Sequence, residues 1–319
     1  MSGTVLVGGG SGFVGTHLTK ALSSKNYGVK IVSRMPGPRN VSWHEIGARG
    51  LPENTVAVVN LAGKCGLLSA CKPYFISLYL GQNVMDFKRR WTAGFKQNVF
   101  SSRINTTASL AKAINNSLKK PKVYISMSGV GAYKPDPEAE YTECSNIRQF
   151  DFFSKLVIEW EKAAALDSAA KNQCRVVAIR SGVVLGRDGG MIKQLYLPFI
   201  LGLGGPVGNG AQFMPWIHIA DLVDLIIFCI ENNQVEGVLN GVAPQVCSNK
   251  QFSNAFAKTL NRPAFIPVPS FVFNLLLGAE RAKMITEGQK VIPQRTQELG
   301  FKFRFPTVQS ACENIVKGA

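Results

Sequence analysis

A glycine-rich segment directly after the first apolar run is the feature that most constrains this chain. Thr4–Val7 is apolar and β-branched, Phe13–Leu22 has helical character, and the residues between them fit both G-x-G-x-x-G and G-x-x-G-x-x-G. Glycines in this context allow a tight turn and a close approach of the backbone to a pyrophosphate, and free N–H groups at the helix start favour phosphate. A turn without a ligand is the alternative. The predicted dinucleotide-binding residues here are Gly9, Gly12, Phe13, Val14 and Gly15.

The second predicted strand, Val29–Ser33, lacks the acidic residue with which NAD-binding proteins hold the ribose hydroxyls. No Asp or Glu precedes Glu45, and the strand runs directly into Ser33 and Arg34. A guanidinium can pair with the 2′-phosphate of NADP, and a serine hydroxyl can add a hydrogen bond. The sequence therefore predicts NADP rather than NAD, with an ordinary surface arginine as the alternative for Arg34.

Strand-like and helical runs alternate through the first half, which predicts a parallel sheet covered on both faces. The predicted fold class is therefore α/β. The expected later elements of the first half are strands at Val41–Trp43, Thr55–Asn60, Val123–Met127 and Arg175–Ile179 and helices within 87–118 and 150–165.

The second half has a different character. Gly182–Gly210 is rich in glycine, which predicts turns and a loop region that faces a ligand. Helices are expected at Ile219–Glu231 and Asn249–Leu260, with a strand at Val238–Asn240. His218 stands at the start of the first of these helices, where we expect it to pack and to form a hydrogen bond rather than to act as a base.

Composition limits the classes of partner. The net charge is +16, which indicates either a solvated basic surface or a site for anionic ligands. The basic clusters at Lys88–Arg90 and Lys119–Lys122 are short and have few aromatic neighbours, so no nucleic acid is predicted as a partner. No apolar run approaches the roughly 18 residues of a membrane-spanning helix. We predict an unknown small-molecule substrate, and the sequence does not fix the oligomeric state.

Cysteine and histidine usage points to a reducing compartment without a metal site. The seven cysteines form no C-x-x-C pair and are odd in number, which predicts a cytoplasmic protein with free thiols. The three histidines, at positions 17, 44 and 218, are not spaced with other ligands, so no metal is expected. A secretory segment is not expected either, because the first strand begins at Thr4.

The glycine loop, Ser33-Arg34 and several later segments together resemble one protein family. The later segments are the residues 60–63, 102–104, 180–186, 215–222, 288–293 and 300–306. With them the chain resembles an extended short-chain dehydrogenase/reductase, in the atypical "epimerase family" branch related to nucleotide-sugar epimerases, over nearly its whole length. The resemblance implies an α/β fold, a Rossmann doubly wound parallel sheet that binds NADP with a smaller C-terminal substrate lobe over the cleft. On this basis we expect the NADP-binding domain at residues 1–180 and the substrate lobe, with returning Rossmann elements, at 181–319. The residues to which it assigns cofactor contacts are Ser33, Arg34, Leu61, Ala62, Asn98, Arg103 and Arg180. For the last two, a structural ion pair is the alternative.

The resemblance fails at the catalytic pair. The family uses Tyr-x-x-x-Lys with a Ser or Thr, where the tyrosine transfers the proton and the lysine lowers its pKa. Lys155 is the plausible lysine, but Asp151 stands four residues before it. Ser128 fits the serine position, whereas Tyr133 and Tyr141 are not four residues before a lysine. Asp151 is a candidate substitute, with a solvent-facing carboxylate as the alternative. The catalytic residues therefore stay unassigned.

Lys64–Gly81 interrupts the family pattern. The segment is apolar and has no acidic residue, and Gly63-Lys64-Cys65 can be encoded by a sequence that contains the splice donor GTAAGT. We hypothesise that it is an insertion from a translated intron, with a docking loop as the alternative.

Two functions remain open at this point. The first is an NADP-dependent oxidoreductase or epimerase-like enzyme of unknown substrate, and the second is a non-catalytic NADP-responsive regulator or scaffold.

Overall fold

The computed structural model describes residues 2–34, 37–63 and 92–318. Lys64–Gly81, Lys88–Arg90 and the two cysteines at 65 and 71 lie outside these ranges. Within the described residues, the central sheet has seven parallel strands in the order typical of a doubly wound fold, which confirms the predicted α/β Rossmann class. Across the sheet they are β3 (Asn40–Val41), β2 (Tyr27–Val32), β1 (Ser2–Gly8), β4 (Thr55–Asn60), β5 (Val123–Gly129), β7 (Arg175–Ser181) and β10 (Gly237–Gly241).

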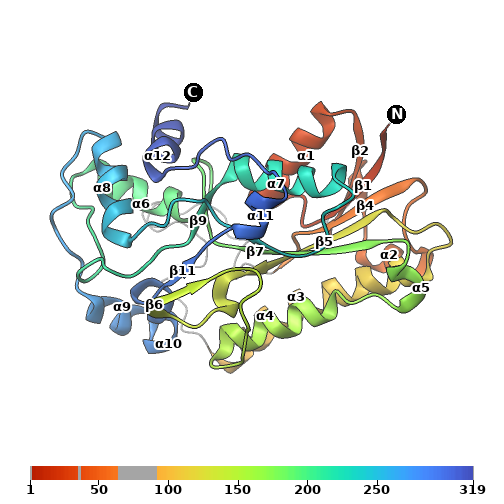
Figure 1. Ribbon diagram of the computed structural model, residues 1–319, viewed down its shortest axis with the longest axis horizontal. Coiled ribbons are helices and arrows are strands. Elements are labelled where there is room, and N and C mark those ends of the chain that lie inside the picture. The colour runs from red at the N-terminus through yellow and green to blue at the C-terminus, as the bar shows by residue number, and fades with distance from the viewer. Residues whose placement is uncertain (1, 35–36, 64–91, 319) are drawn as a thin grey trace.

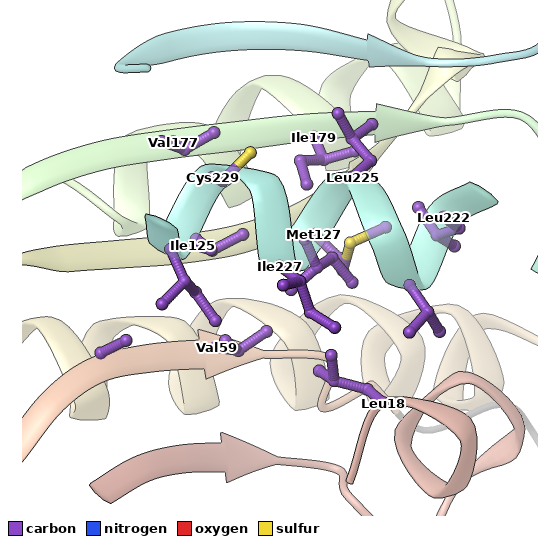
Figure 2. Packing of buried hydrophobic residues seen from close by; sticks show 14 of the residues in the cluster. Leu18, Val59, Ile125, Met127, Val177, Ile179, Leu222, Leu225, Ile227 and Cys229 are labelled. Atoms are coloured by element: carbon purple, nitrogen blue, oxygen red, sulfur yellow. The ribbon is translucent and has the colours of Figure 1, made fainter. Parts of the chain in front are cut away.

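Helices cover both faces of this sheet (Figure 1). On one face lie α1 (Phe13–Ser24) and α7 (Ile219–Glu231), and on the other lie α3 (Ala93–Asn116) and α4 (Phe152–Ala163). Helix α7 is apolar over most of its surface because it is enclosed. Figure 2 shows its side chains lying against those of the central strands and of α1, and the buried members labelled there include Leu222, Leu225, Ile227, Val59, Ile125, Val177 and Leu18.

The short third strand differs from the prediction. It ends at Val41, and Trp43 begins a helix, α2 (Trp43–Arg49), instead of closing a strand. The reason is a capping box: the Ser42 hydroxyl accepts a hydrogen bond from the Glu45 N–H at 3.0 Å, and the Glu45 carboxylate accepts one from the Ser42 N–H at 2.7 Å. This reciprocal pair satisfies N–H groups that a helix start otherwise leaves without partners.

A second apolar core lies at one end of the molecule. It contains buried residues such as Leu185, Trp216 and Phe252 from β8 (Val183–Leu185), β9 (Trp216–His218), α6 (Gly190–Ile200), α8 (Asn249–Thr259) and α12 (Val308–Lys317). The expectation of a loop region at Gly182–Gly210 was therefore wrong in part, since β8 and α6 occupy much of it. The proposed boundary at residue 180 remains a prediction.

Further short elements complete the described chain. They are η2 (Val130–Ala132), β6 (Asp136–Tyr141), α5 (Ser168–Lys171), α9 (Ser270–Leu277), α10 (Ala279–Thr286), β11 (Gln289–Val291) and α11 (Gln294–Glu298). In the part of the chain that the structure describes, none of the helices has the length and apolar character needed to cross a membrane.

Candidate functional site

The glycine loop joins β1 to α1, and two of its glycines have no room for a side chain. Gly9 has φ +76°, and a Cβ placed there would lie 2.8 Å from the Leu61 carbonyl oxygen. A Cβ on Gly15 would lie only 2.3 Å from the Gly9 oxygen, and the Gly12 N–H donates to that same oxygen at 3.0 Å. The loop is thus closed on itself and on the end of β4 through its glycines, while the exposed Ser11 lies between two of them.

Helix α1 presents its first turn at this loop. Gly12 is the N-cap and supplies no capping side chain, and the first turn contains no acidic residue. The N–H groups of Phe13, Val14 and Gly15 therefore have no side-chain acceptor from the cap. Such a helix start combines N–H donors with the positive end of the helix dipole, which is the arrangement that binds phosphate.

The end of β2 lies directly beside the loop and carries positive charge. Gly8 of β1 pairs with Val32 of β2, so Ser33 and Arg34 follow at the same edge. The Arg34 side chain is exposed. The nearest acidic residue in sequence, Glu45, is occupied as a helix cap, and hydrogen bonds from Ser42 lower the pKa of its carboxyl. This edge therefore fits an additional phosphate better than a ribose diol.

The end of β4 is fixed by a buried asparagine. The Asn60 side chain is fully buried, accepts a hydrogen bond from the Ala62 N–H at 3.0 Å and donates one to the Thr107 hydroxyl at 2.8 Å. The Leu61 N–H donates to the Gly8 carbonyl at 2.9 Å. The backbone of the two predicted contact residues is thereby held against the glycine loop.

Helix α3 brings Arg103 to this same edge. A Cβ on Gly63 would lie 3.3 Å from atoms of the Arg103 side chain, whose guanidinium lies 5.3 Å from the Trp160 ring centroid and donates to the Val99 carbonyl at 3.2 Å. Asn98 lies on the exposed side of α3. The structure thus places Arg103 beside the strand ends, while Asn98 is further toward the start of the helix.

Arg180 belongs to a buried polar network at the ends of β5 and β7. Its guanidinium donates to both carboxylate oxygens of Glu161, at 2.8 and 2.7 Å, and to the Tyr133 hydroxyl at 3.0 Å. The Ser128 hydroxyl donates to Glu161 at 2.7 Å. Burial works to lower the pKa of Arg180, but the carboxylate of Glu161 outweighs it and the pKa is raised. The structural ion pair considered from the sequence is present, and a direct cofactor contact of Arg180 remains a proposal.

The two tyrosines near this network are not placed to donate a proton to a substrate. The Tyr133 hydroxyl lies 2.8 Å from the Asn240 Oδ1 and 3.1 Å from the Thr142 carbonyl, and burial raises its pKa. Its ring stacks on Tyr141 with centroids 5.1 Å apart. Neither position resembles the tyrosine of a Tyr-x-x-x-Lys pair.

Asp151, which stands in the place of that tyrosine, is a helix cap. Its carboxylate accepts hydrogen bonds from the N–H and the hydroxyl of Ser154, both at 2.8 Å, at the start of α4. Lys155 lies in the first turn of this helix and is exposed. The structure gives Asp151 a structural role, which weakens its candidacy for proton transfer.

His218 is the N-cap of α7, as expected. Its Nδ1 accepts a hydrogen bond from the Ala220 N–H at 3.2 Å, and its ring lies 4.0 Å from that of Phe305. Burial, followed by the positive charge of Arg304, lowers its pKa to about 4. The prediction of a packing and capping role is confirmed.

The roles of two side chains at the site, the partly buried Glu161 and the fully buried Asn60, were missed. Glu161 holds both Ser128 and Arg180, yet nothing in the sequence separates it from the neighbouring Glu159, since their roles depend on which side of α4 faces the sheet. Asn60 was noted as a strand end and as part of the segment 60–63 that carries the resemblance, but not as the side chain that fixes the Ala62 backbone. In the described residues, no group of three or more His, Cys, Asp or Glu is arranged to hold a metal ion.

Comparison with known proteins decides the family. A model described as the NAD dependent epimerase/dehydratase family matches residues 5–240. The chain belongs to this family. A second model, a domain of unknown function (DUF1731), matches residues 268–315 of this epimerase-family chain.

Relatives of this epimerase-family protein extend over its whole length. The human "Epimerase family protein SDR39U1" is 46% identical over 98% of this chain and 99% of its own, and "Epimerase family protein SSP1921" of Staphylococcus saprophyticus is 33% identical over 98% of both chains. A crystal structure of human SDR39U1 (isoform 2) with NADPH superposes with a TM-score of 0.90 at 45% identity, covering 99% of this chain and 100% of that one. UDP-N-acetylglucosamine 4-epimerase of Bacillus cereus, at 14% identity and a TM-score of 0.72 over 98% of both chains, shares the fold.

Proposed function

We propose that this chain binds NADP(H) and acts as an oxidoreductase or epimerase-like enzyme on a small molecule that is not yet known. The proposal rests on the edge of the sheet that the glycine loop and the end of β2 form together. There, N–H groups without a side-chain cap lie beside the exposed Arg34, and Glu45 is occupied elsewhere. The NADPH in the crystal structure of the human relative supports this assignment.

Each predicted contact residue has a place in this proposal. The pyrophosphate is held at the glycine loop and the first turn of α1, and the adenosine phosphate by the Ser33 hydroxyl and the Arg34 guanidinium. The backbone of Leu61 and Ala62 forms the next part of the edge. The remaining contacts are proposed for Asn98, Arg103 and Arg180.

The bound nucleotide would supply hydride transfer, and the residues of this chain would orient the substrate. Ser128 fits the serine position of the family, and its hydroxyl donates a hydrogen bond to Glu161 at 2.7 Å. Its oxygen can therefore accept a hydrogen bond from a substrate hydroxyl. The substrate would lie between the sheet edge and the C-terminal lobe.

A non-catalytic, NADP-responsive regulator is the second candidate. It is favoured by Asp151 at the tyrosine position, which is bound to Ser154 as a helix cap, and by the burial of Tyr133. In this case the protein would bind NADPH tightly without consuming it.

Calorimetric titration tests the cofactor. We expect NADPH to bind at least ~10-fold more tightly than NADH, because a charge-assisted phosphate contact contributes at least ~1.4 kcal/mol. Arg34→Ala should remove this preference. Arg49→Ala is the control and should keep it, because Arg49 is an exposed arginine at the end of α2. Equal affinities in the unaltered protein would refute the role of Arg34.

A second assay separates the enzyme from the regulator. The protein is mixed with NADPH and a panel of carbonyl compounds, and the absorbance of NADPH is followed. Oxidation of NADPH that is lost in the Arg34→Ala variant supports the enzyme. Tight NADPH binding without turnover on any compound supports the regulator. The cytoplasmic location stays a prediction, and an Arabidopsis thaliana relative at 33% identity is named chloroplastic.

A further inference from the structure

The C-terminal lobe carries an exposed apolar surface that the nucleotide site does not use. Its side chains are between 43% and 81% exposed, although they are large and apolar. Monomeric proteins seldom expose such groups next to one another without a binding role. We call this surface the lobe face, and its members are Leu201, Leu203, Phe265, Ile266, Phe271 and Leu275.

Three neighbouring segments bring these residues together. Val207 and Val268 form an isolated parallel bridge, and the Gly208 N–H donates to the Val268 carbonyl at 2.9 Å. An open hollow of about 460 Å³ is lined by residues of 206–209, 250–254 and 264–267. Helix α9 begins directly after this bridge, and Figure 1 shows it at the same end of the molecule as α8. Phe271 and Leu275 lie one turn apart on α9, so they share one side of it.

The segments that carry the lobe face contain basic but no acidic side chains, and the nearest acidic residue in sequence, Glu280 at the start of α10, is paired with Lys96. No Asp or Glu occurs in residues 189–220 or 237–279, whereas Lys193, Lys250, Lys258 and Arg262 all lie there and are exposed. Lys250 lines the hollow together with Phe265. The whole chain has a net charge of +16, which adds long-range attraction to any extended anionic surface.

We propose that the lobe face docks on an anionic lipid bilayer. Exposed leucine and phenylalanine side chains insert at the level of the headgroups, and neighbouring lysine and arginine side chains pair with lipid phosphates. A second copy of this chain fits less well, because symmetric pairing of the lobe face would bring like charges together. The proposal does not depend on the nucleotide site.

Sedimentation with lipid vesicles tests the docking. We expect binding to vesicles of phosphatidylcholine with 30% phosphatidylserine, binding at least ten-fold weaker to phosphatidylcholine alone, and a loss of binding at high salt. The double variant Phe271→Ser, Leu275→Ser should bind the anionic vesicles at least ten-fold more weakly. Leu118→Ser is the matched control, since Leu118 is fully exposed but lies beyond the end of α3.

A charge-matched pair of variants separates local from overall charge. Lys250→Glu, Arg262→Glu should abolish binding, while Lys119→Glu, Lys122→Glu, which changes the net charge equally on another surface, should retain most of it. Circular dichroism checks that each variant is folded. The proposal fails if the protein does not bind anionic vesicles at low salt. It also fails if Phe271→Ser, Leu275→Ser binds the vesicles as well as Leu118→Ser does, or if the two charge-reversal variants bind them equally well. It also fails if sedimentation velocity shows a dimer that the double apolar variant dissociates while vesicle binding is unchanged.

Discussion

Substituting Glu161 with Gln tests the buried network that links Ser128, Tyr133 and Arg180. The Arg180 side chain is 4% exposed and that of Glu161 is 15% exposed, and two hydrogen bonds join their charged groups. Glutamine keeps the shape of the side chain but removes its charge. Arg180 would then be a buried cation without a counterion, and breaking one partner of such a pair costs about 3–5 kcal/mol.

We expect a loss near the lower limit, about 3 kcal/mol, because the glutamine oxygen still accepts one hydrogen bond. For a chain of 319 residues that corresponds to a fall in Tm of roughly 4–5 °C. Urea titration followed by circular dichroism gives the free energy of unfolding directly. Replacing both partners, as in Glu161→Gln, Arg180→Met, should recover part of the loss, since no unpaired charge remains.

Glu159→Gln provides the control on the same helix. Glu159 pairs with Lys162 at 2.9 Å on the exposed side of α4, and a surface pair of this kind contributes less than about 1 kcal/mol. If Glu161→Gln destabilises the protein no more than Glu159→Gln does, the ion pair does not hold the end of β7 in place. NADPH titration of the same variants would show whether the network also supports the nucleotide site.

Three further substitutions have defined outcomes. Gly15→Ala should lower NADPH affinity at least ~10-fold in a fluorescence titration, because its Cβ would lie 2.3 Å from the Gly9 oxygen; Gly47→Ala, where nothing lies within 4 Å, should instead stabilise α2 by about 0.5–1 kcal/mol. His218 has a folded pKa of about 4, below its ordinary 6.5, so the stability it contributes is present above pH 6.5 and is lost as the pH falls through 4. Urea titrations at pH 7 and pH 4 should show His218→Asn to be less sensitive to acid by about 3 kcal/mol, and equal sensitivity would contradict the burial effect.

The glycine loop was predictable because its information is local. The turn, the helix start and the basic end of β2 lie within the first 34 residues, and parallel pairing of β1 with β2 brings them to one edge. Thr55–Asn60 was predicted with its observed bounds, since a fully buried strand is apolar on both faces.

Other parts depended on contacts that local patterns do not show. The prediction of a strand at Val41–Trp43 overlooked the Ser-x-x-Glu capping box that starts α2, although this pattern can be read from the sequence. The pairing of Glu161 with Arg180 joins a helix to a strand, and only the packing of α4 on the sheet selects it. Contacts of the predicted cofactor residues remain predictions until a bound structure of this chain tests them.

The ring of Phe13 occupies space that only glycines can leave open. A Cβ on Gly186 or Gly189 would lie within 2.8 Å of this ring, so the start of the lobe is seated directly on the first turn of α1. Pulling them apart would expose an aromatic side chain to water, at a cost of up to about 1.5–3 kcal/mol. Phe13 therefore joins the two parts of the molecule, because the same ring packs on the core of the sheet and against the glycines that begin the lobe.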